Sequence, residues 1–268
     1  MIVAINIGNT RISVGFFDEQ TVTLKHRFEL SSVSAKTSHE YFSTISGIAK
    51  ELGVDMSALS GGIISSVVPQ LTATLAETVE WLTGYVPVIV GPGVKTGFPI
   101  KIDSPSELGG DMVANAADAI AKIKNENTVK ACVVVDMSAV TTVSAINARG
   151  EYIGCAIFPG VQMSLEALRG NTALLPSVAC AAQTNAIGKN SQESVLSGVM
   201  LGHAMMIDGF VSRFAREMKA TTEDLKLFAT GEYGDLITPL CKNKFEYDVD
   251  LTLNGLCRIY NKSKENKA

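Results

Sequence analysis

The sequence predicts an α/β protein built from two similar halves, and three observations lead to that prediction. Short β-branched runs alternate with segments whose apolar residues recur at helical spacing, which indicates mixed strands and helices. An apolar strand, a polar residue, a small-residue turn and a second strand open the chain at Ile2, and the same pattern returns at Ala131. The length of 268 residues is ample for two domains. We therefore expect an internal duplication.

The composition excludes several classes of function. The net charge is −4 and the hydrophobic share is 46%, so the chain carries no basic footprint for nucleic acid and has ample material for a core. Its five cysteines form no CxxC pair, which argues against a zinc site and favours a reducing, cytoplasmic location. The start lacks the features of a signal peptide, and we expect no apolar run of the ~20 residues that a membrane span needs.

The first half is expected to begin with a β-hairpin, because two apolar runs flank the turn Gly8–Thr10. The further expected elements are strands at 21–30, 61–68 and 86–90, helices at 38–52, 71–82 and 110–124, and a loop over 91–105.

In the second half the same hairpin pattern is expected over 131–146. The other expected elements are strands at 154–158 and 227–230, and helices at 161–168, 191–218, 222–226 and 251–260. We place the two domains at 1–118 and 119–268, without a flexible linker between them.

The first hairpin is a candidate phosphate site. Gly8 lets the backbone approach a ligand, and successive N–H groups at such a turn can form an anion-binding nest. Asn9 and Thr10 add side-chain donors for phosphate oxygens. An ordinary hairpin turn explains the same residues. The second hairpin favours a phosphate site, because two such hairpins, one in each half, suit a nucleotide clamped between the domains.

Two acidic residues could carry chemistry. Asp136 ends a strand at the second hairpin, where it could hold a cation or simply cap the turn. Asp111 follows two glycines at the start of a helix, where its anion is stabilised, and spacing alone favours a plain cap. A weaker signal is Gly231 after a short strand, where an adenine or ribose could lie against the backbone.

The order of these motifs resembles the type III pantothenate kinases, a family of the acetate kinase/sugar kinase/actin superfamily. The resemblance runs through nearly the whole chain in family order. The matching segments are NIGNTRISVG (6–15), SSVVP (65–69), GPGVKTG with IKIDSPSELGGD (91–111), DMSAVTT (136–142), IFPG (157–160), ALRGNTALLP (167–176), IGKNS (187–191), ATG (229–231) and LTLNGL (251–256).

The resemblance implies two duplicated actin-like ATPase (ribonuclease H-like) domains with a cleft between them. It implies a homodimer that phosphorylates pantothenate with ATP, Mg²⁺ and a monovalent cation, K⁺ or NH₄⁺, in the first step of coenzyme A synthesis. Asp111 would be the general base and Asp136 would hold the monovalent cation. The residues expected at the nucleotide are Asn6, Gly8, Asn9, Thr10, Arg11, Thr141, Thr142 and Gly231. Those expected at the acceptor are Gly109, Gly110, Met112, Ile102 and Ser191.

The departures from the family pattern cluster at the chemistry. Asn6 replaces an aspartate that helps to hold magnesium-ATP, and Met112 replaces an arginine that faces the acceptor. Further changes are Ile102 for a tyrosine, Ala139 for a hydroxyl residue in a hairpin that has lost its glycine, Cys155 for a glycine and Glu232 for a glycine. Three hypotheses follow: a pantothenate kinase with reduced activity, a kinase for a different hydroxyl acceptor, and an inactive paralogue with a binding or regulatory role.

Overall fold

The computed structural model describes residues 1–124, 131–182 and 185–264, and these residues form two compact units. Unit 1 comprises Met1–Pro99, Asp103–Asp118 and the chain from Asp250 onward, and unit 2 comprises Ile100–Ile102 and Ala119–Val249. The division differs from the predicted second domain, 119–268, at its C-terminal end. The last helix belongs with unit 1 because it packs on the sheet of that unit.

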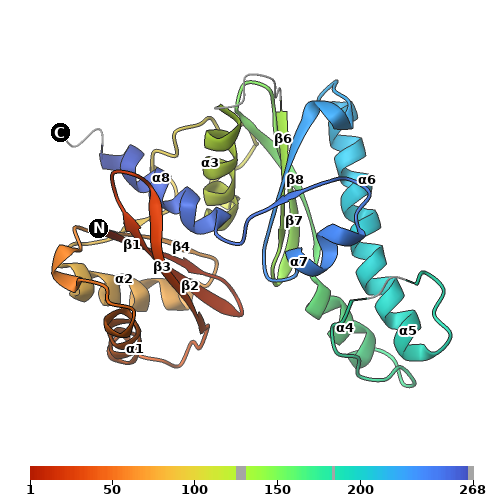
Figure 1. Cartoon of the computed structure of the whole chain (residues 1–268), viewed down its shortest axis with the longest axis horizontal. Helices are drawn as coiled ribbons and strands as arrows, with labels where there is room; N and C mark the ends of the chain where they lie inside the picture. The colour runs from red at the N-terminus through yellow and green to blue at the C-terminus, as the bar shows by residue number, and fades with distance from the viewer. Residues whose placement is uncertain (125–130, 183–184, 265–268) are drawn as a thin grey trace. The chain divides into compact units, whose positions relative to one another are not determined.

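The sheet of unit 1 has five strands in the order β3-β2-β1-β4-β5, with three antiparallel strands followed by two parallel ones (Figure 1). The strands are β1 (Ile2–Ile7), β2 (Arg11–Asp18), β3 (Thr23–Ser31), β4 (Gly62–Ser66) and β5 (Val88–Ile89). The buried face of β1 alternates along the strand, with Val3, Ile5 and Ile7 in one core cluster.

Helices α1 (Ser38–Glu51) and α2 (Pro69–Thr83) contribute side chains to that core cluster, and α8 (Leu251–Lys264) packs on β1, β2 and β4. Helix α3 (Gly110–Lys124) begins in unit 1 and runs past Asp118 into unit 2. Helix α1 begins at a capping box in which Thr37 and Glu40 satisfy each other's backbone N–H groups. Helix α2 begins at Pro69, which has no N–H to leave unpaired, and ends at Gly84 in the left-handed conformation.

Helix α8 approaches the rest of unit 1 closely at glycines. A side chain at Gly255 would meet the backbone of Ala114 in α3, so only glycine lets the two helices come this near. The side chain of Arg258 donates to Asp118 at 2.6 Å, and Asp118 is 1% exposed. These contacts join the C-terminal helix to the segment that the chain contributed 140 residues earlier.

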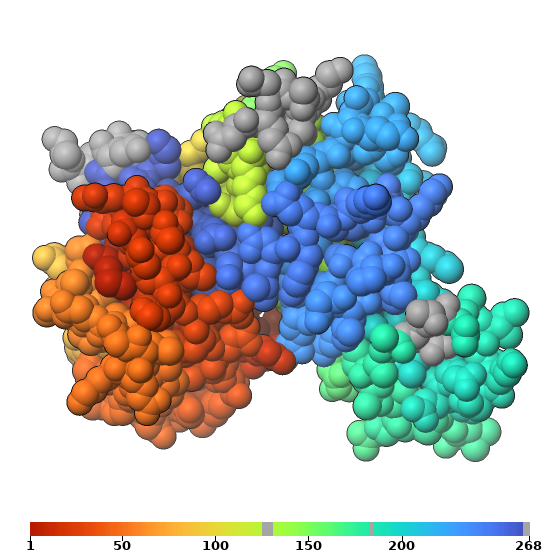
Figure 2. All heavy atoms as spheres, in the orientation of Figure 1, coloured from red at the N-terminus to blue at the C-terminus, as the bar shows by residue number. Residues whose placement is uncertain are grey.

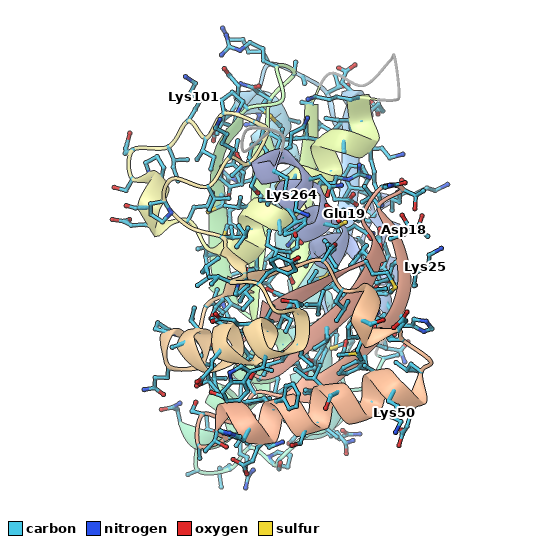
Figure 3. The ribbon with its side chains drawn as sticks, turned by 90° about the vertical axis from the view of Figure 1, so that its left-hand side faces the viewer. Asp18, Glu19, Lys25, Lys50, Lys101 and Lys264 are labelled. Carbon is cyan, nitrogen blue, oxygen red and sulfur yellow. The ribbon has the colours of Figure 1, made fainter. Side chains whose placement is uncertain are left out.

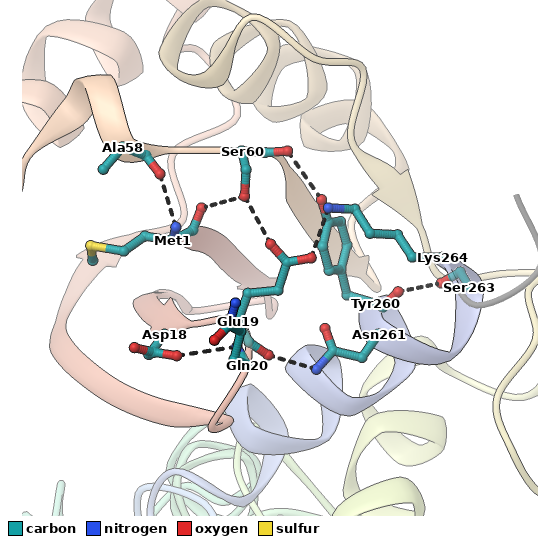
Figure 4. A network of polar contacts seen from close by, with 10 residues as sticks. All are labelled: Met1, Asp18, Glu19, Gln20, Ala58, Ser60, Tyr260, Asn261, Ser263 and Lys264. Atoms are coloured by element: carbon teal, nitrogen blue, oxygen red, sulfur yellow. Dashed lines mark hydrogen bonds and ion pairs between the residues drawn. The ribbon is translucent and has the colours of Figure 1, made fainter. Parts of the chain in front are cut away.

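A polar network ties the end of α8 to the strand ends of unit 1 (Figure 4). Lys264 donates to Glu19 at 2.7 Å, and the Ser60 hydroxyl donates to the other carboxylate oxygen at 2.9 Å. Asn261 donates to the Glu19 carbonyl at 2.8 Å. Figure 3 shows Glu19 and Lys264 side by side, from the β2–β3 turn and from α8.

Unit 2 repeats the sheet of unit 1. Its order is β8-β7-β6-β9-β10, again three antiparallel strands and then two parallel ones. The strands are β6 (Ala131–Met137), β7 (Val140–Ile146), β8 (Tyr152–Pro159), β9 (Leu225–Thr230) and β10 (Glu246–Tyr247). Two copies of one mixed sheet confirm the predicted α/β duplication.

The helices of unit 2 pack one face of this sheet. They are α4 (Val161–Gly170), α5 (Ser191–Leu196), a π-helical turn (Ser197–Leu201), α6 (Gly202–Glu217) and α7 (Gly234–Ile237). The predicted helix over 191–218 is therefore one continuous element with a π-turn inside it. The predicted helix over 222–226 is wrong, because only Thr222–Asp224 form a 3₁₀ turn and β9 begins at Leu225.

The segment Ser191–Glu217 is long and apolar enough to pass a length-and-composition test for a membrane span. This outcome differs from the expectation that no such run exists. The test is also passed by core helices of soluble proteins. Within unit 2 the segment contributes Val195, Met200, Ile207 and Val211 to the main core cluster, which accounts for its hydropathy.

Candidate active site

The site in unit 1 lies where three neighbouring strands carry polar residues in register. Asn6 near the carboxyl end of β1 pairs with Ser13 of β2 and with Ser65 of β4. Residues directly opposite one another share a face of the sheet. Ser13, Asn6 and Ser65 therefore form a cross-strand row, which we call the unit 1 row.

The hairpin turn beside this row is tightly held. The Gly8 N–H donates to the Arg11 carbonyl at 2.9 Å, and the Ser32 hydroxyl donates to the Gly8 carbonyl at 2.5 Å. Asn9 and Thr10 are exposed at the tip. Arg11 is half exposed and pairs with Glu29 at 2.7 Å, so its positive charge is already partly neutralised.

Asp111 lies in the first turn of α3, and its carboxylate is packed against the protein. The Met112 N–H donates to Asp111 Oδ1 at 2.8 Å. Burial nevertheless raises the pKa of the Asp111 carboxyl, and the backbone N–H bonds of Met112 and Asp111 only partly offset it. A carboxylate with a raised pKa at a helix start is a candidate general base.

Two glycines bring this helix start onto the unit 1 row. A Cβ at Gly110 would lie 2.8 Å from the Ser65 hydroxyl, and a Cβ at Gly109 would lie 2.5 Å from Asp111 Oδ1. The bare backbone thus lets α3 begin against Ser65 and leaves space for the Asp111 carboxylate. Ser65 consequently lies between Asn6 and the start of α3.

Met112 is 7% exposed, so this predicted acceptor residue is largely buried within unit 1. Of the other four predicted acceptor residues, Gly109 and Gly110 belong to unit 1, and Ile102 and Ser191 belong to unit 2. Ile102 is half-buried beside the start of β8, where Lys101 donates to the Tyr152 carbonyl at 2.7 Å. Ser191 is exposed as the first residue of α5, directly after the N-cap Asn190.

Unit 2 carries a row at the equivalent place in its own sheet. Asp136 of β6 pairs with Thr142 of β7 and with Thr230 of β9, and we call these three residues the unit 2 row. Asp136 is 7% exposed, and the Ser138 hydroxyl donates to its Oδ1 at 2.5 Å. The duplication therefore places a carboxylate where unit 1 has the Asn6 amide.

Gly231 follows this row with a φ of +94°, a conformation that favours glycine. A Cβ there would lie 2.5 Å from the Met137 carbonyl carbon and 2.7 Å from Asp136 Oδ1. Thr141 points to the opposite face, which also holds Val143, and it is fully buried without a hydrogen-bond partner among the described residues. Of the two predicted threonines, only Thr142 lies on the face of Asp136.

The departures in unit 2 surround the same hairpin. A side chain at Gly160 would collide with the Ala139 carbonyl oxygen, so the end of β8 lies directly against the altered turn. Cys155 is a free, exposed thiol on β8. Glu232 is half-buried next to Gly231, and its charge helps to raise the pKa of the Cys180 thiol, although burial of that thiol is the larger cause.

Two residues of the unit 1 row were not predicted as individual site residues. Ser13 lies in the segment 6–15 and Ser65 in the segment 65–69, both of which resemble the family, but neither serine is predicted to contact a ligand. A hydroxyl inside an apolar strand carries no local sign of function. The signal that could have found Ser65 is its equivalence to Thr230, because each lies near the carboxyl end of the strand that pairs in parallel with the first strand of its unit.

Comparisons with known proteins identify the family of the chain. The family model for type III pantothenate kinase matches residues 2–213. Type III pantothenate kinases from Geotalea uraniireducens and Myxococcus xanthus are 36% and 35% identical to the chain over 99% and 98% of its length, covering 100% and 99% of their own. A third, from Dehalococcoides mccartyi, is 34% identical over 98% of the chain and 96% of its own length. The chain belongs to the type III pantothenate kinase family.

Solved structures support the fold alone. A protein of Campylobacter jejuni assigned to the Baf family of transcriptional activators has a TM-score of 0.58 at 16% identity, covering 98% of this chain and 99% of its own. A reductive activator for a corrinoid, iron–sulfur protein has a TM-score of 0.54 at 12% identity, covering 98% of this chain and 60% of its own. With the repeated sheet order, the family assignment gives a two-domain fold of the actin-like ATPase type.

Proposed function

We propose that this chain transfers the γ-phosphoryl group of ATP to the hydroxyl of pantothenate. The observation that carries the proposal is the position of Asp111 in a family member. Its carboxylate has a raised pKa and lies in the first turn of α3, where Gly110 abuts the unit 1 row. A base and a phosphate-binding hairpin in one unit are what a phosphoryl transfer needs.

In the proposed reaction the acceptor oxygen forms a bond to the γ-phosphorus as the bond to the β–γ bridging oxygen breaks. ADP leaves with the electrons of that bond, and the hydroxyl proton passes to the Asp111 carboxylate. The raised pKa of Asp111 brings it closer to that of an effective base near neutral pH. Bound substrate would exclude water from the site, and the hydrogen bond between the Asp111 carboxylate and the acceptor hydroxyl would then be stronger.

The nucleotide phosphates are assigned to the first hairpin. Asn9 and Thr10 are exposed at its tip, and Asn6 and Ser13 of the unit 1 row lie on the two strands that it joins. Magnesium arrives with ATP and neutralises charge on its phosphates. The unit 1 row offers it only amide and hydroxyl oxygens, because no carboxylate stands in that row.

A monovalent cation is assigned to Asp136. The residues fit such an ion, because one carboxylate balances one charge and the hydroxyls of Thr142 and Thr230 stand in the same row. The described part of the chain holds no group of three or more His, Cys, Asp or Glu residues suited to a more highly charged metal. The bound ion would supply positive charge at the unit 2 row.

A homodimer formed through unit 2 is part of the proposal. Among its described residues, the segment from α4 to α6 carries five exposed apolar side chains. This part of the chain is drawn in green to light blue in Figure 2. The five side chains are Met163, Leu174, Ile187, Met205 and Met206. Surfaces of this kind are typical of contacts between subunits. The five free cysteines suit a reducing, cytoplasmic location.

One observation favours a second candidate function, which is phosphorylation of a different hydroxyl acceptor. Met112, which follows the proposed general base Asp111, is apolar and largely buried, so it offers no charged partner for an acceptor carboxylate. An acceptor without a carboxylate would lose nothing there. The test of function therefore needs a panel of acceptors that share the hydroxyl and differ in this group.

The test is ADP release by the purified chain with ATP, Mg²⁺ and K⁺. Pantothenate, pantetheine and pantothenyl alcohol serve as acceptors. The proposal predicts pantothenate-dependent release that Asp111→Asn abolishes and Glu107→Gln, an exposed neighbour, leaves intact. Release with pantetheine or the alcohol but not with pantothenate would support the second candidate. If a folded protein released no ADP with any acceptor, only the third hypothesis, an inactive paralogue, would remain.

A further inference from the structure

A cavity of about 370 Å³ lies in unit 2, at the end of the sheet opposite to the unit 2 row. It is lined by Ala131 at the start of β6, by the turn 147–149 between β7 and β8, and by the end of α6. Because a strand rises about 3.3 Å per residue, Ala131 is roughly 17 Å from Asp136. The volume falls within the range of about 300–1,000 Å³ that is typical of small-molecule sites. The cavity is therefore a candidate binding site separate from the unit 2 row.

Lys219, which lines this cavity, stands at a position where glycine is the usual residue. Helix α6 ends in a Schellman motif, in which the Lys219 N–H donates to the Arg216 carbonyl at 3.1 Å. The second bond of the motif runs from the Ala220 N–H to the Ala215 carbonyl at 2.9 Å. Lys219 has a φ of +56°, in the left-handed region where a side chain is strained. The backbone is thus strained at the residue that contributes an ammonium group to the cavity.

Glu217, the last residue of α6, also lines the cavity against a local preference. The C-terminus of a helix carries partial negative charge, which disfavours a carboxylate. Both Glu217 and Lys219 are exposed at the cavity. Within the described residues, neither side chain makes a hydrogen bond or an ion pair, with the other or with a third residue. An unpaired carboxylate and an unpaired ammonium group therefore line the same cavity.

The other two charged side chains of the cavity already have partners. Arg149 pairs with Glu151, with Nη2 and Oε2 at 2.7 Å. Asp224 accepts from the N–H and the hydroxyl of Thr221, each at 3.0 Å. These two charges serve the turns in which they stand. The charges that remain for a ligand are those of Glu217 and Lys219.

We propose that this cavity binds a small zwitterion with an apolar side chain, of the chemical class of an apolar α-amino acid. Lys219 pairs with the carboxylate of the ligand and Glu217 with its ammonium group. Ala131, Ile153 and Met218 offer apolar surface to the side chain. A simple acid would face the like charge of Glu217, and a simple amine that of Lys219. The inference goes beyond the proposed function and does not depend on it.

The experiment measures the binding of three probes to the full chain by calorimetry at pH 7. L-leucine carries both charges, L-leucinamide lacks the carboxylate, and 4-methylpentanoate lacks the ammonium group. L-leucine should bind at least about tenfold more tightly than either of the other two, in line with one charged hydrogen bond. Equal binding of the three probes, or no binding of L-leucine, would overturn the inference.

Lys219→Gly separates binding from folding, because glycine suits the left-handed residue of the motif. The variant should melt at or above the temperature of the unmodified chain. It should nevertheless weaken L-leucine and 4-methylpentanoate about tenfold and leave L-leucinamide unchanged. The control is Arg213→Ala, which removes a positive charge from an exposed position of α6 outside the cavity. Unchanged L-leucine affinity in Lys219→Gly would overturn the inference, as would an equal loss in the control.

Glu217→Gln tests the other charge without altering the backbone. It should weaken L-leucine and L-leucinamide about tenfold and leave 4-methylpentanoate at least as tightly bound, because a like charge is removed. The control is Glu223→Gln, an exposed residue outside the cavity. An equal effect of Glu217→Gln on all three probes, or an equal effect of the two variants on L-leucine, would overturn the inference.

Discussion

The unit 1 row and the unit 2 row stand at the same place in two copies of one sheet, yet they differ in charge. Ser13, Asn6 and Ser65 are neutral and, within the described chain, have no side-chain hydrogen bonds. In unit 2 the central residue is Asp136, which accepts a hydrogen bond from Ser138 and lies against the Gly231 backbone. The duplicated scaffold keeps the geometry, and the side chains alone decide what each copy can bind.

The two units also differ in how the chain completes them. Unit 2 is almost continuous in sequence, whereas unit 1 needs α8 from the far end of the chain. Helix α8 packs on β1, β2 and β4, where a Cβ added to Gly15 would lie 3.2 Å from Leu253 Cδ1. The stability of the strands that carry the unit 1 row therefore depends on contacts made by the last helix.

The largest expected effect is on catalysis by unit 1. Asp111→Asn should lower kcat by about 10²–10⁴-fold, because it removes the general base. In the unmodified chain the acid limb of the kcat profile should lie above the ordinary range of an aspartate, since burial raises the pKa of Asp111. Steady-state ADP release from pH 4 to pH 9 measures both.

The same variant has a stability readout with a defined sign. The folded pKa of Asp111 is raised, so stability falls as pH rises from the unfolded value through the folded one. Asp111→Asn should remove that loss and melt at or above the temperature of the unmodified chain at pH 7. A lower melting temperature together with a normal kcat would make Asp111 a structural cap.

The next effect separates the stabilities of the two units. Arg258→Met should lower the stability of unit 1 by about 3 kcal/mol, because it strips the ion partner from a carboxylate that is 1% exposed. The matched change in unit 2, Arg149→Met, removes an exposed charge and should matter little. Hydrogen exchange would show the loss in β1 and β4. Equal loss in β6 and β9 would mean that the units do not differ in this way.

A third effect tests the charge of the unit 2 row. Asp136→Asn should raise the K⁺ concentration for half-maximal activity at least about tenfold, which corresponds to about 1.4 kcal/mol. The attraction between two unit charges about 4 Å apart near a protein surface is about 4 kcal/mol, so loss of the carboxylate charge is large enough to cause this change. Asp235→Asn, an exposed aspartate on α7, is the control. The same activation by K⁺ in the unmodified chain and in both variants would contradict the assignment of the cation site to Asp136.

The smallest effect concerns the network at the end of α8. Lys264→Ala should cost less than about 1 kcal/mol, because Lys264 is 45% exposed and its pair with Glu19 is screened by solvent. Urea unfolding in low and high salt should show the loss shrinking as salt rises. Lys50→Ala on α1 is the control (Figure 3). A loss as large as that of Arg258→Met would place the main attachment of α8 at its tip.

The sequence predicted most of the sheets because β-branched runs ended at clear turns. The hairpin around Gly8 and its copy after Asp136 both formed as expected. The two-residue strand β10 was missed, since Glu246 and Tyr247 carry no alternating pattern. The 222–226 segment was predicted as a helix although its capping box, Thr221 with Asp224, supports only a single 3₁₀ turn.

Long-range packing explains what the sequence could not predict. Nothing in 251–264 states that this helix joins unit 1, because the decisive features are the fit of Gly255 against Ala114 and the Arg258–Asp118 pair. Ser65 has a buried hydroxyl that lacks a partner within the described chain, which only three-dimensional neighbours reveal. Asp111 could be predicted through its motif, whereas its raised pKa depends on how deeply α3 is packed.

The most direct test of the central claim is mass-spectrometric detection of 4′-phosphopantothenate from the unmodified chain with ATP, Mg²⁺, K⁺ and pantothenate. The account predicts product that accumulates in step with ADP and disappears with Asp111→Asn. ADP formation without phosphopantothenate, or product formation that survives Asp111→Asn, would contradict it.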